Sequence, residues 1–411
     1  MGSCPLFHFI EEGNDMQSIF DIRPAIVVVN YNRPQCTMRI LNSISNARYA
    51  YNDITLVISI DCSDASETIN EIAQSFNWRF GKKVIIKHKQ RLGLKEHILS
   101  CGKLSEKYGA VIILEDDLFV SKNYYQYTVQ AIAKYKKEKN VAGIALYSHA
   151  WNGYSGCFFS PQHSEFDTYF GQFSITWGQC WTKEQFAGFY NWLKNNPVFL
   201  DDPRLPMDVN TWGEKSWGRF FFKYLVEKGL YYVIPYKSFT TNFSDFGEHN
   251  YAASCSHQVL LESSNTDRIY SFPDFENGIF YDSFFDRVFT KNDVIGGISG
   301  NLICCDFNHC KRFADDKRYL LTDKKYKALE VVKTFGISIR PIELNPLYNV
   351  PGNDISLYKL TNQRHFVLKK EKLRHSRLAF ELYGFSSSVL FRASLMSVFQ
   401  KILRRMRRLF R

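Results

Sequence analysis

Short apolar runs alternate with polar loops and helix-like segments through the first part of the chain. Residues 25–29 form a continuous run of alanine, isoleucine and valine, and similar runs cover residues 54–60, 84–86 and 110–114. Such runs suit strands that are buried on both faces of a parallel sheet. Between them, apolar positions recur at three- and four-residue steps, as expected of helices. The repeated order of strand, polar loop and helix predicts an α/β fold with an open, mostly parallel sheet flanked by helices.

Polar side chains follow each of the four predicted strands. Asn30 comes after the first strand, Asp61 after the second and Arg91 after the third, and an acidic triplet at 115–117 ends the fourth. In open α/β sheets, ligands bind at the carboxyl ends of the strands. We therefore expect these side chains to line one ligand site.

The triplet Glu115-Asp116-Asp117 carries the clearest chemical signal. Adjacent carboxylates repel each other and raise each other's pKa unless a cation offsets their charge. Oxygen ligands suit Mg²⁺ and Mn²⁺, which commonly bridge to substrate phosphates. Taken alone, the triplet also fits a solvated strand end. Its position after the fourth strand favours a divalent-metal site for a diphosphate.

Three stretches resemble glycosyltransferases of the GT-A fold, whose sheet is Rossmann-like: residues 27–34 (Val-Val-Val-Asn-Tyr-Asn-Arg-Pro), 59–61 (Ser-Ile-Asp) and 114–117 (Leu-Glu-Asp-Asp). The likeness is closest to bacterial family-two-like members and to the Golgi N-acetylglucosaminyltransferase that begins complex N-glycans. It extends to about residue 250 of the 411-residue chain.

The resemblance implies a nucleotide-sugar role for the loops after the first three strands. Asn30, Asn32 and Arg33 would line the nucleotide pocket. Asp61 would hydrogen-bond the base, and Arg91 would lie near the nucleotide or its phosphates.

The resemblance also separates the roles within the acidic triplet. Asp116 would lie near the ribose with Glu115 supporting it, and Asp117 would bind the Mn²⁺ or Mg²⁺ cofactor. Relatives of this type transfer a sugar from a nucleotide-diphosphate donor with inversion at the anomeric carbon.

The acceptor side of the expected site carries tryptophans. Residues 174–181 resemble an acceptor-side segment, in which Trp177 and Trp181 would stack on sugar rings. Both indole rings fit the protein core equally well, because tryptophan is commonly buried. Residues 212–218, which include Trp217, resemble the segment that supplies the catalytic base.

That second segment departs from the family pattern, because it contains no Asp. Glu214 is the nearest carboxylate and the candidate general base, and Asp208 is the reserve. A plain surface role for Glu214 remains open.

Residues 246–250 resemble a closing loop whose His249 would reach the diphosphate or the metal. A lone loop histidine is also commonly just exposed.

Basic charge gathers at the C-terminus. The net charge is +11, and the last 20 residues hold seven Lys or Arg and no Asp or Glu. Residues 389–411 predict an amphipathic helix that binds an anionic membrane surface, with a helix docked on its own domain as the alternative. The predicted apolar face holds Phe391, Leu395, Val398, Ile402, Met406 and Leu409. Because the charge is confined to this tail, a nucleic-acid partner is not expected.

The remaining features predict a cytoplasmic protein, peripheral on the inner face of the cell membrane. The ten Cys lack metal-site spacing and suit free thiols in a reducing compartment. We see neither a signal peptide nor a run of about 20 apolar residues. The expected organisation is a lead-in (1–22), a GT-A domain (23–300) with a nucleotide-sugar half (23–125) and an acceptor half (126–300), an accessory region (301–385) and a basic tail (386–411).

The sequence therefore predicts an inverting, metal-dependent hexosyl- or N-acetylhexosaminyltransferase. Its partners would be a nucleotide-sugar donor and a glycan or lipid-linked acceptor, as in bacterial surface polysaccharide synthesis. Two alternatives stay open. One is a non-catalytic sugar-nucleotide- or glycan-binding protein, favoured by the missing Asp near Trp217. The other is a sugar nucleotidyltransferase, disfavoured because residues 30–34 do not form a Gly-rich loop.

Overall fold

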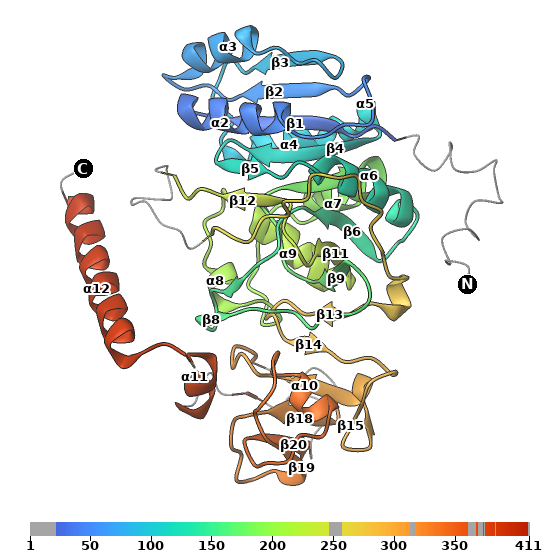
Figure 1. Ribbon diagram of the computed structural model, residues 1–411, viewed down its shortest axis with the longest axis vertical. Coiled ribbons are helices and arrows are strands. Elements are labelled where there is room, and N and C mark those ends of the chain that lie inside the picture. The colour runs from blue at the N-terminus through green and yellow to red at the C-terminus, as the bar shows by residue number, and fades with distance from the viewer. Residues whose placement is uncertain are drawn as a thin grey trace, which may run out of the picture.

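A ten-stranded sheet with the order β14-β13-β9-β11-β6-β10-β4-β1-β2-β3 forms the centre of the molecule (Figure 1). The computed structural model describes residues 22–245, 257–312, 314, 317–360, 367–368, 373, 375–382 and 384–409. The strands of this sheet are β1 (Ala25–Asn30), β2 (Leu56–Ile60), β3 (Lys83–Lys87), β4 (Ala110–Glu115), β6 (Val141–Ala145), β9 (Thr168–Gly171), β10 (Gln179–Thr182), β11 (Tyr231–Pro235), β13 (Phe280–Tyr281) and β14 (Arg287–Val288).

The first four of these strands in the sequence are parallel neighbours. Val28 of β1 pairs with Ile58 of β2 on one side and with Leu114 of β4 on the other. β3 pairs in parallel with the free side of β2. The carboxyl ends of β4, β1, β2 and β3 therefore lie along one edge of the sheet. The predicted α/β fold with a mostly parallel sheet is confirmed.

Alternate residues of β1 enter two separate cores. Val27 and Val29 belong to the cluster under helices α4, α7 and α9, whereas Ile26 and Val28 belong to the cluster under α2, α3 and α6. Successive side chains of a strand point to opposite faces, so a continuous apolar run is what a sheet covered on both faces requires. The helices are α2 (Pro34–Ser45), α3 (Ser66–Ser75), α4 (Leu94–Lys103), α5 (Ser105–Tyr108), α6 (Tyr124–Tyr135), α7 (Lys183–Asn195), α8 (Met207–Asn210) and α9 (Trp217–Lys228).

Local sequence signals set several helix ends. α2 begins at Pro34, whose fixed φ suits a first helical position. α7 begins with a capping box, in which Thr182 and Gln185 exchange side-chain and backbone hydrogen bonds. α9 is capped by the following residue, Gly229, which adopts the left-handed conformation with φ 64°. The segment between β3 and β4 forms two helices, α4 and α5, rather than one.

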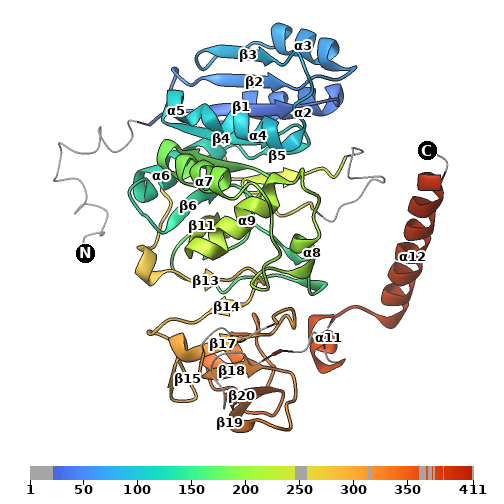
Figure 2. The same ribbon diagram turned by 180° about the vertical axis from the view of Figure 1, so that it is seen from behind.

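A second, four-stranded sheet with the order β17-β18-β20-β19 follows the large one in the sequence and lies at one end of it (Figures 1 and 2). Lys311 joins the two parts, because its ammonium lies 2.5 Å from Asp282 next to β13. The remaining elements are β5 (Leu118–Val120), β7 (Trp151–Asn152), β8 (Cys157–Phe158), β12 (Thr240–Asn242), η2 (Phe275–Asn277), β15 (Val294–Ile295), β16 (Ile298–Ser299), η3 (Gly300–Leu302), β17 (Ile303–Cys305), β18 (Tyr319–Thr322), β19 (Glu330–Phe335), α10 (Leu344–Leu347), β20 (Ile355–Lys359), α11 (His375–Glu381) and α12 (Ser387–Leu409).

Two predictions about the whole chain can be compared with these described ranges. The eight cysteines that the structure describes are free thiols. Among the helices of the same ranges, none combines the length and the apolar character needed to cross a membrane.

Candidate functional site

Arg33 binds both aspartates at the end of β4. Its guanidinium pairs with Asp116 Oδ1, and its Nη1 lies 3.3 Å from Asp117 Oδ2. β1 and β4 are parallel neighbours, and Val29 pairs with Glu115. The loop after β1 therefore carries Arg33 directly to the acidic triplet, as expected for loops that leave the same sheet edge.

The positive charge of Arg33 only partly offsets the negative charge of the acidic triplet. Burial raises the pKa of Asp116 to about 6, although Arg33 opposes the rise. Burial, followed by the charge of Asp117, raises the pKa of Glu115 well above its usual value. Burial disfavours the charged form of Arg33, but the two aspartates raise its pKa above the ordinary value. One guanidinium thus faces three carboxyl groups, which leaves the cluster suited to a further cation.

The residues present fit an open divalent-metal site. Asp117 Oδ1 is buried, and within the described ranges it accepts no hydrogen bond. The same ranges hold no group of three or more His, Cys, Asp or Glu residues that could hold a metal ion. Mg²⁺ and similar hard ions are commonly bound by one or two carboxylates together with water and substrate phosphates. Asp117, with Asp116 beside it, offers that kind of partial ligand set.

Asp61 organises the neighbouring loop. Its Oδ1 accepts hydrogen bonds from the backbone N–H groups of Cys62 and Leu92, each at 2.8 Å, and its Oδ2 accepts one from Gly93 at 2.9 Å. Gly93 has φ 76°, a left-handed conformation that favours glycine. Asp61 therefore fixes the loop after β3 against the end of β2.

Arg91 lies in this fixed loop and faces the loop after β1. Its guanidinium carbon is 4.7 Å from the ring centroid of Tyr31. The Arg91 side chain is exposed, as is Asn32 in the opposite loop. The structure therefore brings together basic, aromatic and polar groups beside the acidic triplet.

The Asn30 side chain makes hydrogen bonds within the chain that the sequence pattern did not predict. Its Nδ2 donates to the carbonyls of Val28 at 3.0 Å and Ser59 at 3.1 Å, and its Oδ1 accepts from Thr37 Oγ1 at 2.9 Å. Both amide donors are used within the chain, so Asn30 ties β1 to β2 and to α2. A direct contact with a nucleotide stays a prediction.

A buried histidine contacts β2 near the same edge of the sheet. His97 in α4 is 2% exposed, and its Nε2 lies 2.7 Å from Ser59 Oγ. Burial lowers the pKa of His97 to about 4, against the opposing charge of Asp61. The sequence pattern did not single out His97, because a histidine on a helix carries no motif of its own.

Trp177 lies at the same sheet edge as the triplet. β10 runs antiparallel to β4, with Gln179 opposite Ile113, so the residues just before β10 lie near the carboxyl end of β4. The Trp177 ring lies 4.5 Å from the ring of His257 and 4.9 Å from that of Tyr147. Trp177 is half-buried, so part of its surface remains exposed to solvent.

His257 is a candidate site residue that the sequence pattern missed. Its carbonyl accepts a hydrogen bond from Tyr147 Oη at 3.0 Å. Burial lowers the pKa of the imidazole, and the charge of Asp117 opposes this shift. His257 is therefore within electrostatic reach of the expected metal ligand. The predicted ligand His249 lies outside the described residues.

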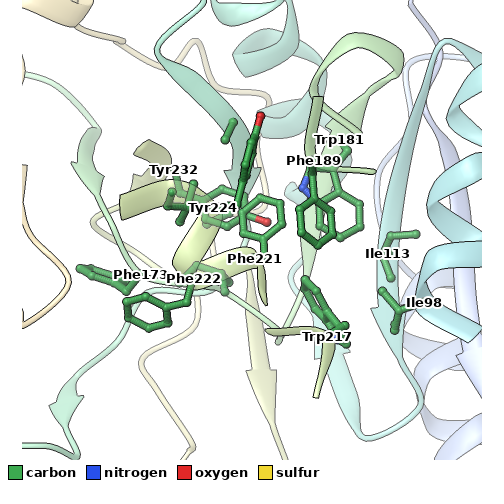
Figure 3. Packing of buried hydrophobic residues seen from close by; sticks show 14 of the residues in the cluster. Ile98, Ile113, Phe173, Trp181, Phe189, Trp217, Phe221, Phe222, Tyr224 and Tyr232 are labelled. Atoms are coloured by element: carbon green, nitrogen blue, oxygen red, sulfur yellow. The ribbon is translucent and has the colours of Figure 1, made fainter. Parts of the chain in front are cut away.

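Trp181 and Trp217 belong to the core, which is the alternative that the sequence left open for the Trp181 ring. They are 0% and 1% exposed, and their rings meet edge to face with centroids 5.5 Å apart. Figure 3 shows both rings packed among Phe189, Phe221 and other aromatic side chains. β10 lies between β4 and β6, so a large side chain on it is covered by α7 and α9.

The carboxylates proposed for proton transfer are both exposed. Glu214 lies in the turn before α9, and Asp208 lies in the short helix α8. The first turn of α9 contains no acidic residue. A Cβ built on Gly218 would lie 3.2 Å from Thr176, so α9 begins against the segment that contains Trp177. The turn that contains Glu214 therefore leads toward the segment that contains Trp177, and the role of Glu214 as base stays a prediction.

One family model matches the part of the chain that contains the triplet. Residues 25–191 match the family model Glycosyl transferase family 2. This range covers β1 to most of α7, including the triplet and Trp177. The match supports the predicted glycosyltransferase resemblance for this part of the chain, whereas the narrower likeness to the Golgi enzyme stays a prediction. No curated protein matches the chain.

Solved structures with a similar arrangement are distant in sequence. They include Staphylococcus aureus TarS residues 1–349 (14% identity, TM-score 0.35, 54% of this chain and 60% of that one). A mannosyltransferase from Pyrobaculum calidifontis in complex with GDP-Man and Mn²⁺ has 11% identity and a TM-score of 0.32 over 53% of this chain and 56% of that one. GalNAc-T7 with UDP, GalNAc and Mn²⁺ has 14% identity and a TM-score of 0.36 over 57% of this chain and 46% of that one. The chain thus spans 60% or less of these proteins.

Proposed function

We propose that this chain, whose residues 25–191 match Glycosyl transferase family 2, transfers a sugar from a nucleotide-diphosphate donor to an acceptor hydroxyl. The observation that supports this most is the Arg33–Asp116–Asp117 cluster at the edge where β1 and β4 end, with a partnerless buried oxygen on Asp117 among the described residues. A diphosphate with its cation fits such a cluster.

The donor half of the site binds and orients the leaving group. A divalent cation, when bound, supplies the positive charge that stabilises the departing diphosphate. Asp117 would hold that cation, and Arg33 favours the ionised form of Asp116 beside it. Asp61 fixes the loop that carries Arg91, and the Arg91 guanidinium would approach the nucleotide or its phosphates.

The acceptor half supplies the proton transfer in a single displacement. Glu214 takes the proton from an acceptor hydroxyl while that oxygen forms a bond to C1 of the donor sugar. The bond between C1 and the phosphate oxygen breaks, and its electron pair leaves with the nucleoside diphosphate. Attack from the face opposite the leaving group inverts the anomeric centre. Asp208 is the reserve base, and Trp177 offers an aromatic face for the acceptor.

The biological setting belongs to the same proposal. A hexosyl or N-acetylhexosaminyl donor and a glycan or lipid-linked acceptor would suit bacterial surface polysaccharide synthesis on the cytoplasmic side of a membrane. The amphipathic tail is the feature that motivates a lipid-linked acceptor.

A thermal-shift screen of nucleotide sugars with Mn²⁺ tests donor binding. A donor at 100 times its dissociation constant stabilises the native state by about 2.7 kcal/mol, so the correct donor should raise the Tm clearly. Nucleotides released from that donor are then measured over time. Slow, Mn²⁺-dependent release of nucleoside diphosphate supports the enzyme, whereas no shift with any donor contradicts the proposal.

A non-catalytic binding protein is the second candidate, because the first turn of α9 lacks an acidic residue. It predicts a donor-dependent rise in Tm without any release of nucleoside diphosphate. The third alternative, a sugar nucleotidyltransferase, predicts release of pyrophosphate from a nucleoside triphosphate and a sugar phosphate.

A further inference from the structure

Helix α12 (Ser387–Leu409) exposes a continuous set of large apolar side chains. Their exposed fractions run from 37% for Leu403 to 66% for Phe391. Soluble proteins seldom expose so many neighbouring apolar side chains without a partner for them. The exposed residues are Val389, Phe391, Leu395, Met396, Val398, Phe399, Ile402, Leu403 and Met406.

These apolar residues share one side of the helix. At about 100° per residue, they fall within roughly half of its circumference. Arg392 is the one basic residue inside that arc, and long basic side chains can extend their charge sideways to water or phosphate. By the same spacing, the other basic residues of α12 fall outside the arc or at its borders: Lys401, Arg404, Arg405, Arg407 and Arg408. No Asp or Glu follows Glu381.

The start of this helix is attached to the second sheet through α11. Arg340 pairs with Glu381 at 3.3 Å, and its guanidinium carbon lies 4.1 Å from the ring centroid of Phe380. Arg377 pairs with the same glutamate at 2.7 Å. Beyond this attachment, α12 extends away from the rest of the chain in both views (Figures 1 and 2). Among its described residues, those from Phe391 onward are all exposed, so docking on the chain's own domains is not observed.

We propose that α12 binds the surface of an anionic lipid bilayer, with its axis in the plane of the interface. The apolar side would enter the boundary between headgroups and acyl chains, and the Lys and Arg residues would lie at the level of the lipid phosphates. The helix is too basic to cross the bilayer, in agreement with the membrane-span result given above.

Charge decides between a bilayer and a second copy of the chain. Two α12 helices packed on each other would bring their basic residues together with no acidic residue to offset them. A two-helix seam also needs only a narrow apolar stripe, whereas this apolar side covers half of the helix. An anionic bilayer surface can cover the full width of the apolar side and can also offset the positive charge of the basic residues.

The inference goes beyond the proposed transfer reaction and does not depend on it, because membrane binding is measured without a donor or an acceptor. Full-length protein is sedimented with vesicles of phosphatidylcholine alone or of phosphatidylcholine mixed with phosphatidylglycerol. We expect binding to the mixed vesicles that weakens at high salt, since salt screens the attraction. Equal binding to both vesicle types, or binding to neither, overturns the proposal.

Matched variants test whether vesicle binding depends on the apolar side of α12 rather than on exposed apolar residues elsewhere in the chain. The combined change Phe391→Ser, Phe399→Ser and Ile402→Ser should weaken partitioning at least about tenfold, because three large apolar groups no longer enter the bilayer. The control changes Leu260→Ser and Ile269→Ser, at residues 91% and 82% exposed on the folded body, should leave binding unchanged. A triple variant that binds vesicles as wild type does contradicts the proposal.

A charge variant covers the case in which the triple variant does not form its helix. Arg404→Gln, Arg405→Gln and Arg408→Gln keep the apolar side and should reduce binding to phosphatidylglycerol vesicles while leaving the helix content by circular dichroism unchanged. Light scattering of the wild type tests the remaining alternative, in which α12 joins two copies of the chain. A dimer that the Phe391, Phe399 and Ile402 changes convert to a monomer, without vesicle binding, would assign α12 to a second copy instead.

Discussion

The two halves of the candidate site are built differently. On the donor side, charged groups from separate loops contact one another at the ends of β1, β2 and β4, as in the Arg33–Asp116 and Asp61–Gly93 contacts. On the acceptor side, Trp181 and Trp217 are buried, and the carboxylate proposed as base, Glu214, is exposed in a turn. The difference indicates that the side proposed to bind the donor is organised in the free protein, whereas the side proposed for the acceptor depends on fewer fixed contacts.

Removing the proposed base gives the largest expected effect on the acceptor side. Glu214→Gln should lower kcat by about 10²–10⁴ with an unchanged donor dissociation constant, because general-base help is lost but the donor half is intact. Steady-state rates and donor thermal shifts measure the two quantities. Asp208→Asn is the matched comparison, and full activity in Glu214→Gln with loss in Asp208→Asn would transfer the role to Asp208.

Two tryptophans on the acceptor side should behave in opposite ways. Trp217→Ala should reduce the free energy of unfolding by about 3–5 kcal/mol, because it empties a fully packed core position. Trp177→Ala should retain most of the stability and raise the acceptor KM, since its ring lies at the sheet edge beside His257. Chemical denaturation and acceptor titrations distinguish them. A Trp177→Ala variant that loses only stability would place Trp177 in the core as well.

On the donor side, Arg33→Met should cost about 3 kcal/mol of stability, because it leaves the buried Asp116 carboxylate without its partner. Arg48→Met, which removes an ion pair to the exposed Asp267, is the control and should cost less than about 1 kcal/mol. Added Mn²⁺ should raise the Tm of Arg33→Met more than that of the wild type, since the cation replaces the lost positive charge. An equal rise in both proteins would argue against a cation at Asp116 and Asp117.

The smallest expected effect concerns pH and the buried His97. Its pKa is lowered from 6.5 to about 4 in the folded chain. Between these values the unfolded chain binds a proton and the folded chain does not, so stability is lost as the pH falls from 6.5 toward 4, by at most about 3 kcal/mol. Denaturation midpoints across this range should fall less steeply in His97→Gln. The same slope in His97→Gln as in the exposed control His163→Gln would show that His97 is not responsible.

The sequence predicted the donor half because each strand there is a continuous apolar run and each polar residue follows directly after it. Parallel pairing then brings Arg33 and Asp117 together, although 84 positions separate them. The same regularity explains why the α/β sheet was predictable.

The acceptor half was less predictable for two physical reasons. Whether a tryptophan lies in the core or at a surface depends on which helices cover its strand, and neighbouring positions such as Trp177 and Trp181 look alike in the sequence. His257 approaches Asp117 only through tertiary folding, and His97 is buried by its contact with Ser59 on another strand. The lack of a hydrogen-bond donor to Asp117 Oδ1 among the described residues is likewise a property of the folded chain.

The central claim is that Asp117 holds the cation of a nucleotide-diphosphate sugar. The most direct measurement is the Mn²⁺-dependent release of nucleoside diphosphate by the wild type and by Asp117→Asn, with the surface change Asp274→Asn as the control. We predict that Asp117→Asn lowers release by at least about 10³-fold, because the transition-state charge loses its main electrostatic stabilisation, and that Asp274→Asn has no effect. Release by Asp117→Asn at the wild-type rate and with the wild-type Mn²⁺ dependence would contradict this account.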